Sequence, residues 1–526
     1  MEQARTAADG ALEAALERIH GRTIDAHLRF LSHPLLEGRA PGTRGGTLAM
    51  EYIRGQFERV GLEPVQSTYL QEVPMVGMDP HPALAFALPT GETIDPAYRD
   101  DYVLEAGRPA PEVRVDAPLV FCGYGITAPE YGWDDFGDAD VRGKVLLVRV
   151  NDPGTEATPG FFGGKALTYY GRWTYKYEEA ARRGAAGVLL VHTDESAGYG
   201  WNVVRTSNTG EQFDLAGDPA LPLDVRGWVS WRTAERLAAA AGHDLAALVA
   251  ASEERSFRPV DTGIRVRAHV RSTIREVRTA NVVGLLTGSD PARANEVVVL
   301  SSHYDHLGTR VGDDGQTQVY HGAYDNASGV AVLLALAEAA ASAPARPPRP
   351  LLFVATTAEE SGLLGAEWYA RHPLYPLATT AGVLNVDGAN LFGPTTDIAP
   401  LGADRSELGE MARAAAAAEG MEIAPEAHPE QGMFFRQDHF PFARAGVPAL
   451  AMDHGLRYVG RPEGWGEEQY HAFNTHHYHQ PSDAYREGFD YGGAVQQARV
   501  MLRTAWAAAT APALPAWAEG SEFRRP

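Results

Sequence analysis

The chain has 526 residues, of which 44% are hydrophobic, and a formal net charge of -22. Because single hydrophobic cores stop growing near about 250–300 residues, this length predicts two domains. The acidic balance argues against a nucleic-acid-binding protein, which needs a basic face. No run approaches the roughly 20 apolar residues that span a bilayer.

The N-terminus and the single cysteine leave the compartment open. Residues 1–22 predict a polar, alanine-rich helix without the apolar stretch of a secretory signal. Cys122 cannot form an internal disulfide, so the thiol count does not demand an oxidising compartment. The protein is therefore either cytoplasmic or has lost a signal peptide.

Two helices open the fold. Residues 24–31 and 48–60 each place apolar side chains on one helical face, and residues 34–46 between them form a loop rich in Gly and Pro. We assign residues 1–111 to the N-terminal part of the main domain.

The pattern of predicted elements changes after Pro111. Residues 117–122, 144–150 and 187–191 are typical of strands, and residues 175–183 of a helix. This stretch contains no cluster of ligand-type residues. We expect residues 112–262 to form an inserted, β-rich domain.

From about residue 263 onward, short apolar runs alternate with helical segments. Such alternation predicts an α/β sandwich with a largely parallel sheet, whose ligands gather at strand ends. The expected strands are 297–300, 351–355, 383–386 and 448–452, and the expected helices are 328–343, 365–371, 405–419 and 493–509.

Several of these strands end in residues that bind metals. The first runs into His303, with Asp305 two positions later, which suits an imidazole ligand supported by a carboxylate. The second is followed by Glu359 and Glu360, where one carboxylate can bind a cation and the other can carry a proton. Each feature alone has a plainer interpretation, a surface histidine or a solvated turn.

Three more candidates complete the set. Asp325 lies in a Gly-flanked loop at a helix start, where it could instead be an N-cap. Asp387 follows the third strand, and His479 has Asp483 four residues later. The order His, Asp, Glu, Asp, His mixes nitrogen and oxygen ligands, which suits zinc, and a shared carboxylate is a common way to hold two ions together.

These motifs resemble the co-catalytic zinc aminopeptidase family, which also includes glutamate carboxypeptidase and the inactive transferrin receptors. The resemblance rests on His303-Tyr304-Asp305, the Asn-Ala-Ser-Gly run after Asp325, Glu359-Glu360, Asn385-Val386-Asp387 and Tyr478-His479. Leu36-Glu37-Gly38-Arg39 is similar to the family's N-terminal loop, and residues 143–145 and 184–188 are similar to a protease-associated domain. The fold implied is a three-layer sandwich with a mixed, largely parallel sheet and this insert.

The resemblance implies two zinc ions and a role for each residue. His303 and Asp387 would bind one zinc, Glu360 and His479 the other, with Asp325 bridging them. Glu359 would be the general base, and Asp305 and Asp483 would be carboxylates that support the ligands. Tyr324 and Gln437 depart from residues common in the family, which could reshape the substrate pocket.

The implied activity is removal of N-terminal residues from peptides. We select Tyr470, in the aromatic- and His-rich run 469–478, as the oxyanion donor. A carboxypeptidase stays open, with Arg310, Arg436 and Arg457 as cations for a substrate carboxylate, as do a receptor-like binding protein and a glutaminyl cyclase. Neither G-x-S-x-G nor H-E-x-x-H occurs, which argues against serine hydrolysis and single-zinc peptidases of that type. Family members are commonly periplasmic or secreted. The sequence does not give the oligomeric state.

Overall fold

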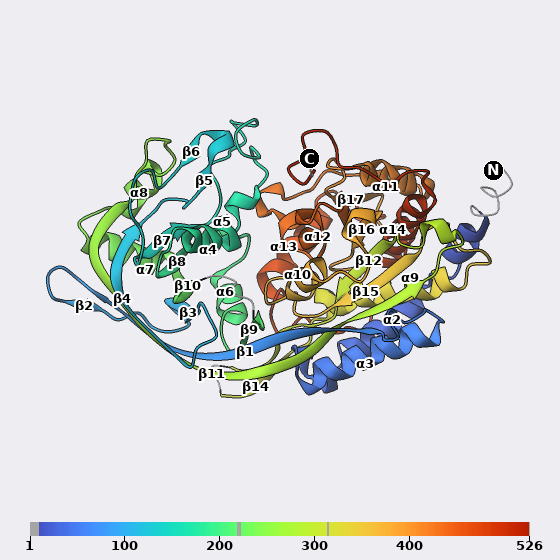
Figure 1. The fold of residues 1–526 in the computed structure, drawn as a ribbon, viewed down its shortest axis with the longest axis horizontal. Coiled ribbons are helices and arrows are strands. Elements are labelled where there is room, and N and C mark those ends of the chain that lie inside the picture. The colour runs from blue at the N-terminus through green and yellow to red at the C-terminus, as the bar shows by residue number, and fades with distance from the viewer. Residues whose placement is uncertain (1–9, 218–221, 313–314, 525–526) are drawn as a thin grey trace. The chain divides into compact units, whose positions relative to one another are not determined.

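The computed structural model describes residues 10–217, 222–312 and 315–524, and the chain divides into two compact units. The first consists of Met1–Pro74, Val277–Ala427 and Arg436–Pro526, and the second of Met75–Glu276 and His428–Phe435. Figure 1 shows their elements as ribbons. The expected N-terminal helix is seen over residues 10–16, whereas residues 1–9 lie outside the described part.

The first unit is built around a mixed sheet with strand order β18-β17-β19-β16-β12-β15-β11. β12 is parallel to both β15 and β16, and β16 is parallel to β19, whereas β11 and β17 pair in the antiparallel sense with their neighbours β15 and β19. The expected α/β sandwich with a largely parallel sheet is confirmed. The strands are β11 (Val260–Leu286, entering with its C-terminal part), β12 (Val298–His303), β13 (Gly308–Val311), β14 (Thr317–Tyr320), β15 (Leu351–Thr356), β16 (Gly382–Asn385), β17 (Asp397–Leu401), β18 (Glu422–Ile423) and β19 (Ala449–His454).

Helices surround this sheet, and all but α12 and α13 lie close to expected positions. They are α2 (Gly21–Leu31), α3 (Arg44–Arg59), α9 (Gly329–Ala341), α10 (Leu364–Arg371), α11 (Glu407–Ala418), α12 (His439–Arg444), α13 (Trp465–His476) and α14 (Gly492–Thr510). Among the described helices none is long and apolar enough to cross a bilayer.

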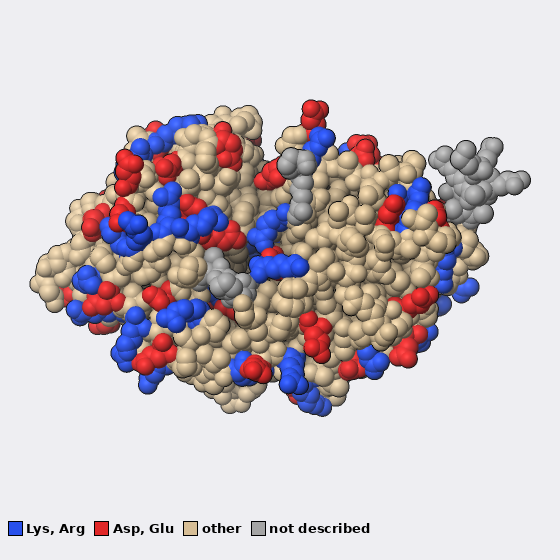
Figure 2. Space-filling view, viewed as in Figure 1, with Lys and Arg blue, Asp and Glu red and all other residues tan. Residues whose placement is uncertain are grey.

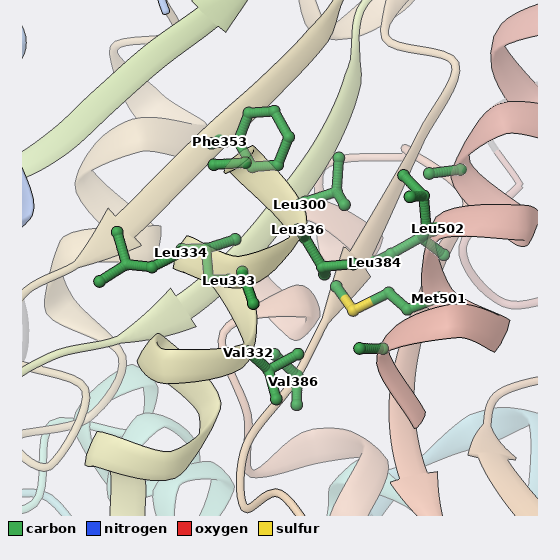
Figure 3. Close-up of a cluster of buried hydrophobic side chains, with 14 of the residues drawn as sticks. Leu300, Val332, Leu333, Leu334, Leu336, Phe353, Leu384, Val386, Met501 and Leu502 are labelled. Carbon is green, nitrogen blue, oxygen red and sulfur yellow. The ribbon is translucent and has the colours of Figure 1, made fainter. Parts of the chain in front are cut away.

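The main core lies between the sheet and helices α9 and α14. α9 is apolar on nearly all sides, as expected of a helix enclosed by other elements. Figure 3 shows Leu333 and Leu336 of α9 near Leu300 of β12, Leu384 of β16 and Met501 of α14. All five side chains are at most 2% exposed, and burying each contributes about 1.5–3 kcal/mol. This packing fixes the sheet edge that carries the ligand candidates.

The second unit has strand order β11-β4-β7-β8-β10-β3, with β1 pairing to β2, β9 and β11. Its strands are β1 (Leu70–Ala87), β2 (Thr93–Ile94), β3 (Tyr102–Ala106), β4 (Glu112–Phe121), β5 (Thr127–Ala128), β6 (Trp133–Asp134), β7 (Val145–Arg149), β8 (Gly187–His192), β9 (Gln212–Leu215), β10 (Val225–Ser230) and the N-terminal part of β11. Its helices are α4 (Trp173–Arg182), α5 (Asp194–Ala197), α6 (Trp201–Ser207), α7 (Trp231–Ala240) and α8 (Leu245–Ala251).

This division differs from the expected domains 1–111, 112–262 and 263–526. The second unit begins earlier because β1 and β3 pair with its strands β9 and β10. It extends beyond residue 262 because β11 pairs with β4 as far as Arg271. The described part of this unit also contains five α-helices and is a mixed α/β structure rather than mostly β.

The face in Figure 2 carries both Lys and Arg and Asp and Glu side chains, interspersed rather than gathered by sign. The excess of acidic residues behind the net charge of -22 therefore does not form one continuous acidic surface on this face.

Candidate metal centre

Three ligand candidates meet because three parallel strands are neighbours. β12 lies between β15 and β16, so their carboxyl ends share one edge of the sheet. His303 is the last residue of β12, Glu359 and Glu360 follow β15, and Asp387 follows β16. His303 Nε2 lies 3.2 Å from Asp387 Oδ1 and 3.8 Å from Glu359 Oε2.

Asp325 lies between two imidazoles. Its Oδ1 is 3.3 Å from His303 Nε2, and its Oδ2 is 3.2 Å from His479 Nε2. The residue makes no capping hydrogen bond, and the N-cap of α9 is Ser328. The N-cap interpretation therefore does not describe Asp325, whose two oxygens instead face two separate groups of donors.

The second group gathers around Glu360. Its Oε2 lies 3.0 Å from His479 Nε2, and its Oε1 lies 2.6 Å from His306 Nδ1. His306 was not among the expected ligands, because a histidine next to a ligand motif more often belongs to the pocket wall. Among the described residues, His303, Asp325 and Asp387 form one set with the spacing of a metal site, and His306, Asp325 and Glu360 another.

The donor spacing fits zinc. Zinc–ligand bonds of about 2.0–2.1 Å in a tetrahedron put neighbouring donor atoms about 3.3 Å apart. The contacts of Asp325 with His303 and His479 and of Asp387 with His303 measure 3.2–3.3 Å, and that of Glu360 with His479 measures 3.0 Å. Residues of the right chemistry therefore stand at the right separation for two ions sharing Asp325.

Two buried carboxylates hold the backbone beside these ligands. Asp305 accepts hydrogen bonds from the amides of Glu359 at 3.1 Å and Glu360 at 3.4 Å. Asp483 accepts from the amides of Tyr324 at 2.8 Å and Asp325 at 3.0 Å. Each carboxylate thereby orients a loop that supplies ligands, and Asp305 also lies 3.7 Å from His303 Nδ1.

Glu359 and Glu360 are neighbours in sequence with opposite electrostatics. Burial raises the pKa of Glu359 well above its usual value, with Asp387 and Glu360 nearby adding to the effect. Burial also disfavours the charged form of Glu360, but His479 and His306 outweigh it and bring its pKa to about 2. Two carboxyl groups with such separated pKa values suit two tasks, one carrying a proton and one staying ionised.

The two imidazoles are tuned by the same acidic surroundings. Burial lowers the pKa of His479, but Glu360 and Asp325 raise it overall to about 10. Burial likewise opposes the charged form of His303, and Asp387 and Glu359 raise its pKa well above the usual value. Without metal the cluster is a network of compensating charges, as expected of a site that exchanges protons for cations.

Tyr478 is a phenol of the site that belongs to the expected Tyr478-His479 motif but was not the expected oxyanion donor. Burial raises the pKa of Tyr478, and the carboxylates of Asp325, Glu360 and Glu359 add to this, while Arg436 opposes it. Arg436 donates to the Tyr478 hydroxyl at 3.3 Å. Tyr470, the expected oxyanion donor, lies on α13 and is half-buried. The position of Tyr478 directly before His479 was the available signal.

Asp438 is a further buried acid near the cluster. Burial raises its pKa to about 7, against the influence of His303. Its Oδ2 accepts a hydrogen bond from Thr356, the last residue of β15, and its Oδ1 has no hydrogen-bond partner in the described structure. Gln437 beside it contacts Asn385 at 3.3 Å.

Tyr324, which departs from the family pattern, forms part of an aromatic wall. Its hydroxyl lies 2.8 Å from His454 Nε2, and its ring lies 4.5 Å from that of Phe473. A Cβ on Gly388 would come within 2.6 Å of the Tyr324 ring, so the wall lies against the loop that follows Asp387.

Arg39 ties the N-terminal loop to the metal-site loops. The side chain is 1% exposed and donates to the carbonyls of Leu31 at 2.6 Å, Tyr304 at 2.8 Å, His321 at 2.6 Å and Gly322 at 2.9 Å. These carbonyls flank the segments that carry His303 and Asp325. Burial lowers the pKa of Arg39 to about 10, so it keeps its charge at neutral pH.

We expect Arg39→Met to lower the free energy of unfolding by at least about 3 kcal/mol, because it leaves buried carbonyls without a donor. Urea unfolding monitored by circular dichroism measures this loss. Arg44→Met is the matched control, because Arg44 is 67% exposed and its surface ion pair with Glu37 is worth less than about 1 kcal/mol. Equal stability of the two variants would contradict the positioning role of Arg39.

Comparison with known proteins agrees with this geometry. Residues 281–505 match peptidase family M28. A probable zinc metalloprotease of Leptosphaeria maculans is 29% identical over 271 residues, covering 45% of this chain and 59% of that protein. Leupeptin-inactivating enzyme 1 of Streptomyces exfoliatus is 27% identical over 208 residues, covering 39% and 43%. The chain thus spans less than two thirds of these relatives.

The fold is shared over a longer stretch. The aminopeptidase from Aneurinibacillus sp. strain AM-1 superposes with a TM-score of 0.54 at 19% identity, covering 95% of this chain and 97% of that one. The matched family region begins in β11 and contains all of the ligand candidates and Glu359. This region, less than half of the chain, is therefore similar to peptidase family M28.

Proposed function

We propose that this protein is a zinc-dependent exopeptidase, most specifically an aminopeptidase that removes N-terminal residues from peptides. The observation that carries the proposal is the geometry of two groups of donors that meet at the two oxygens of Asp325, with the Glu359 carboxylate 3.8 Å from His303. The zinc metalloproteases and the aminopeptidase to which the chain is similar support it.

We assign the residues as follows. His303 and Asp387 would hold one zinc, Glu360 and His479 would hold the other, and Asp325 would contribute an oxygen to each. Asp305 and Asp483 fix the backbone of the ligand loops through the amide hydrogen bonds described above. When bound, the two ions supply Lewis acidity, which polarises the substrate carbonyl and lowers the pKa of water toward about 7.

The chain's own acid–base group is Glu359. It accepts a proton from the attacking water and returns it to the leaving amine, which suits a carboxyl group whose pKa lies well above the usual value. The negative charge that develops on the carbonyl oxygen requires a donor. We propose Tyr478 in preference to Tyr470, because Tyr478 directly precedes the ligand candidate His479 and its hydroxyl accepts a hydrogen bond from Arg436 at 3.3 Å.

A carboxypeptidase is the second candidate, and Arg436 favours it. This guanidinium lies at the site through its hydrogen bond to Tyr478, where it could receive a substrate carboxylate. Arg457 is less suitable, because it pairs with Asp397 at 3.2 Å and Glu422 at 2.8 Å. The receptor-like interpretation has less support, because all five ligand candidates and Glu359 converge.

Two substrates separate the candidates. We expect turnover of an amino-acid anilide with a free amine and no turnover of an N-blocked peptide. An aminopeptidase is contradicted if only the blocked peptide is cleaved. In that case Arg436→Gln, compared with Arg457→Gln, tests the carboxypeptidase: only the former should raise the KM.

Metal removal tests the whole scheme at lower cost. We expect a chelator to abolish anilide hydrolysis and added zinc to restore most of it. The ligand side chains alone, without the ions, cannot polarise the substrate carbonyl or lower the pKa of water. Metal analysis of the dialysed protein, followed by the rate at increasing zinc, measures the recovery. Activity that is indifferent to the chelator would overturn the metal-dependent mechanism.

A further inference from the structure

A separate pocket of about 450 Å³ lies within the second unit. It opens at the carboxyl ends of the parallel strands β8 and β10, which end at His192 and Ser230. Open α/β sheets commonly bind ligands at this edge. The volume lies in the range of about 300–1,000 Å³ typical of small-molecule sites.

One wall is the start of helix α7. Ser230 ends β10 and caps this ten-residue helix, accepting a hydrogen bond from the amide of Thr233 at 3.3 Å. Trp231 and Arg232, the first two residues of α7, line the pocket. Their amides belong to the first turn of the helix, which carries partial positive charge and attracts anions.

Two opposite charges border the pocket. Arg232 has neither an ion pair nor a hydrogen bond among the described residues, although ion pairs hold many other arginines of the chain. Asp194 lines the pocket with a side chain that is 79% exposed, and its contact is with His192 Nε2 at 3.1 Å. The pocket thus offers an unpaired cation and a solvated carboxylate to the same ligand.

Apolar surface accompanies these charges. The half-buried indoles of Trp201 and Trp231 line the pocket. Trp201 is fixed by its hydrogen bond to the carbonyl of Arg99 at 2.9 Å and by the ring of His192 at 5.5 Å. His192 is 4% exposed, and its Nδ1 has no hydrogen-bond partner in the described structure. The His192 ring is held by its Nε2 contact with Asp194 at 3.1 Å and by the ring of Trp228 at 6.1 Å, so it forms a fixed part of the pocket wall.

We infer that this pocket binds an aromatic amino acid in its zwitterionic form. The ligand carboxylate pairs with Arg232 and the first amides of α7, and the ammonium group pairs with Asp194. The aromatic ring lies against Trp201 and Trp231. Charge-assisted hydrogen bonds of this kind are about twice as strong as neutral ones, and aromatic pairs add specificity beyond the area they bury.

The test titrates the full-length protein with L-phenylalanine and follows tryptophan fluorescence and heat. We expect saturable binding, and no saturable binding of N-acetyl-L-phenylalaninamide, which lacks both charges. Arg232→Gln and Asp194→Asn should each weaken binding at least tenfold. Arg236→Gln, one turn further along α7 and outside the pocket lining, is the matched control and should bind as the parent does.

The same variants separate this site from the metal centre. Arg232→Gln should leave the anilide turnover unchanged, because the pocket belongs to the second unit and contains none of the metal-site residues. Binding is measured whether or not the protein is a peptidase, so failure of the proposed function does not affect the result. Absence of saturable phenylalanine binding, or equal binding by the parent and Arg232→Gln, would overturn the proposal.

Discussion

Replacing Glu359 by Gln is expected to lower the kcat for an amino-acid anilide by about 10²–10⁴-fold, the usual contribution of general acid–base catalysis. Gln has nearly the same shape but cannot accept and return a proton. The zinc content should stay at the parent's level, because Glu359 Oε2 is 3.8 Å from His303 Nε2, outside the closer contacts among the assigned ligands. Steady-state kinetics and metal analysis on the same preparation measure both quantities.

The control for this variant is Glu463→Gln, which removes a carboxylate from an exposed residue that is not among the assigned site residues. It should retain the parent's kcat. If Glu359→Gln kept activity within a few-fold of the parent, another group would have to carry the proton, and buried Asp438, with a pKa of about 7, would be the first to examine. If the variant lost zinc together with activity, Glu359 would be a ligand rather than a base.

The sequence marks the ligand candidates because their signal is local. His303, Glu360 and Asp387 each stand at or just after a short apolar run, and such runs are typical of buried parallel strands. What the sequence does not provide is the order of the strands in the sheet. Only the pairing of β12 with both β15 and β16 places these ends side by side.

His306 and Tyr478 show where local patterns fail. Each lies within three residues of an expected ligand, and from sequence alone neither could be told from a residue of the pocket wall. His306 reaches Glu360 because the carboxylate that follows β15 turns toward it, a contact between residues 54 positions apart. The pKa of Tyr478 is likewise raised, beyond the effect of burial, by carboxylates that belong to other loops. Contacts of this range depend on tertiary packing rather than on periodicity.

The two compact units differ from the expected domains for another reason. β11 alternates buried Ile264, Val266, Ala268 and Val270 with charged residues, a period of two that is typical of a half-buried strand. Its length of 27 residues is far beyond the usual strand, so a boundary at 262 cut through it. β1 contains Pro74, Pro80 and Pro82, which argue against a strand in a sequence-based assignment.

Asp325→Ala should have a broader effect than Glu359→Gln, because it removes ligand atoms from both groups of donors at once. Oδ1 faces His303 and Oδ2 faces His479, so each zinc would lose a ligand. We expect zinc content to fall well below the parent's after dialysis and anilide hydrolysis to fall to background. Excess zinc should restore little activity, in contrast to the chelated parent.

Two further variants test whether this result is specific to Asp325. Asp404→Ala removes an exposed carboxylate and should keep both zinc and activity. Asp325→Asn preserves the shape of the side chain but not its charge, so it should fold like the parent by circular dichroism while binding zinc more weakly. Retention of the parent's zinc content in Asp325→Ala would show that the two groups of donors bind metal independently, and the shared-carboxylate arrangement would have to be abandoned.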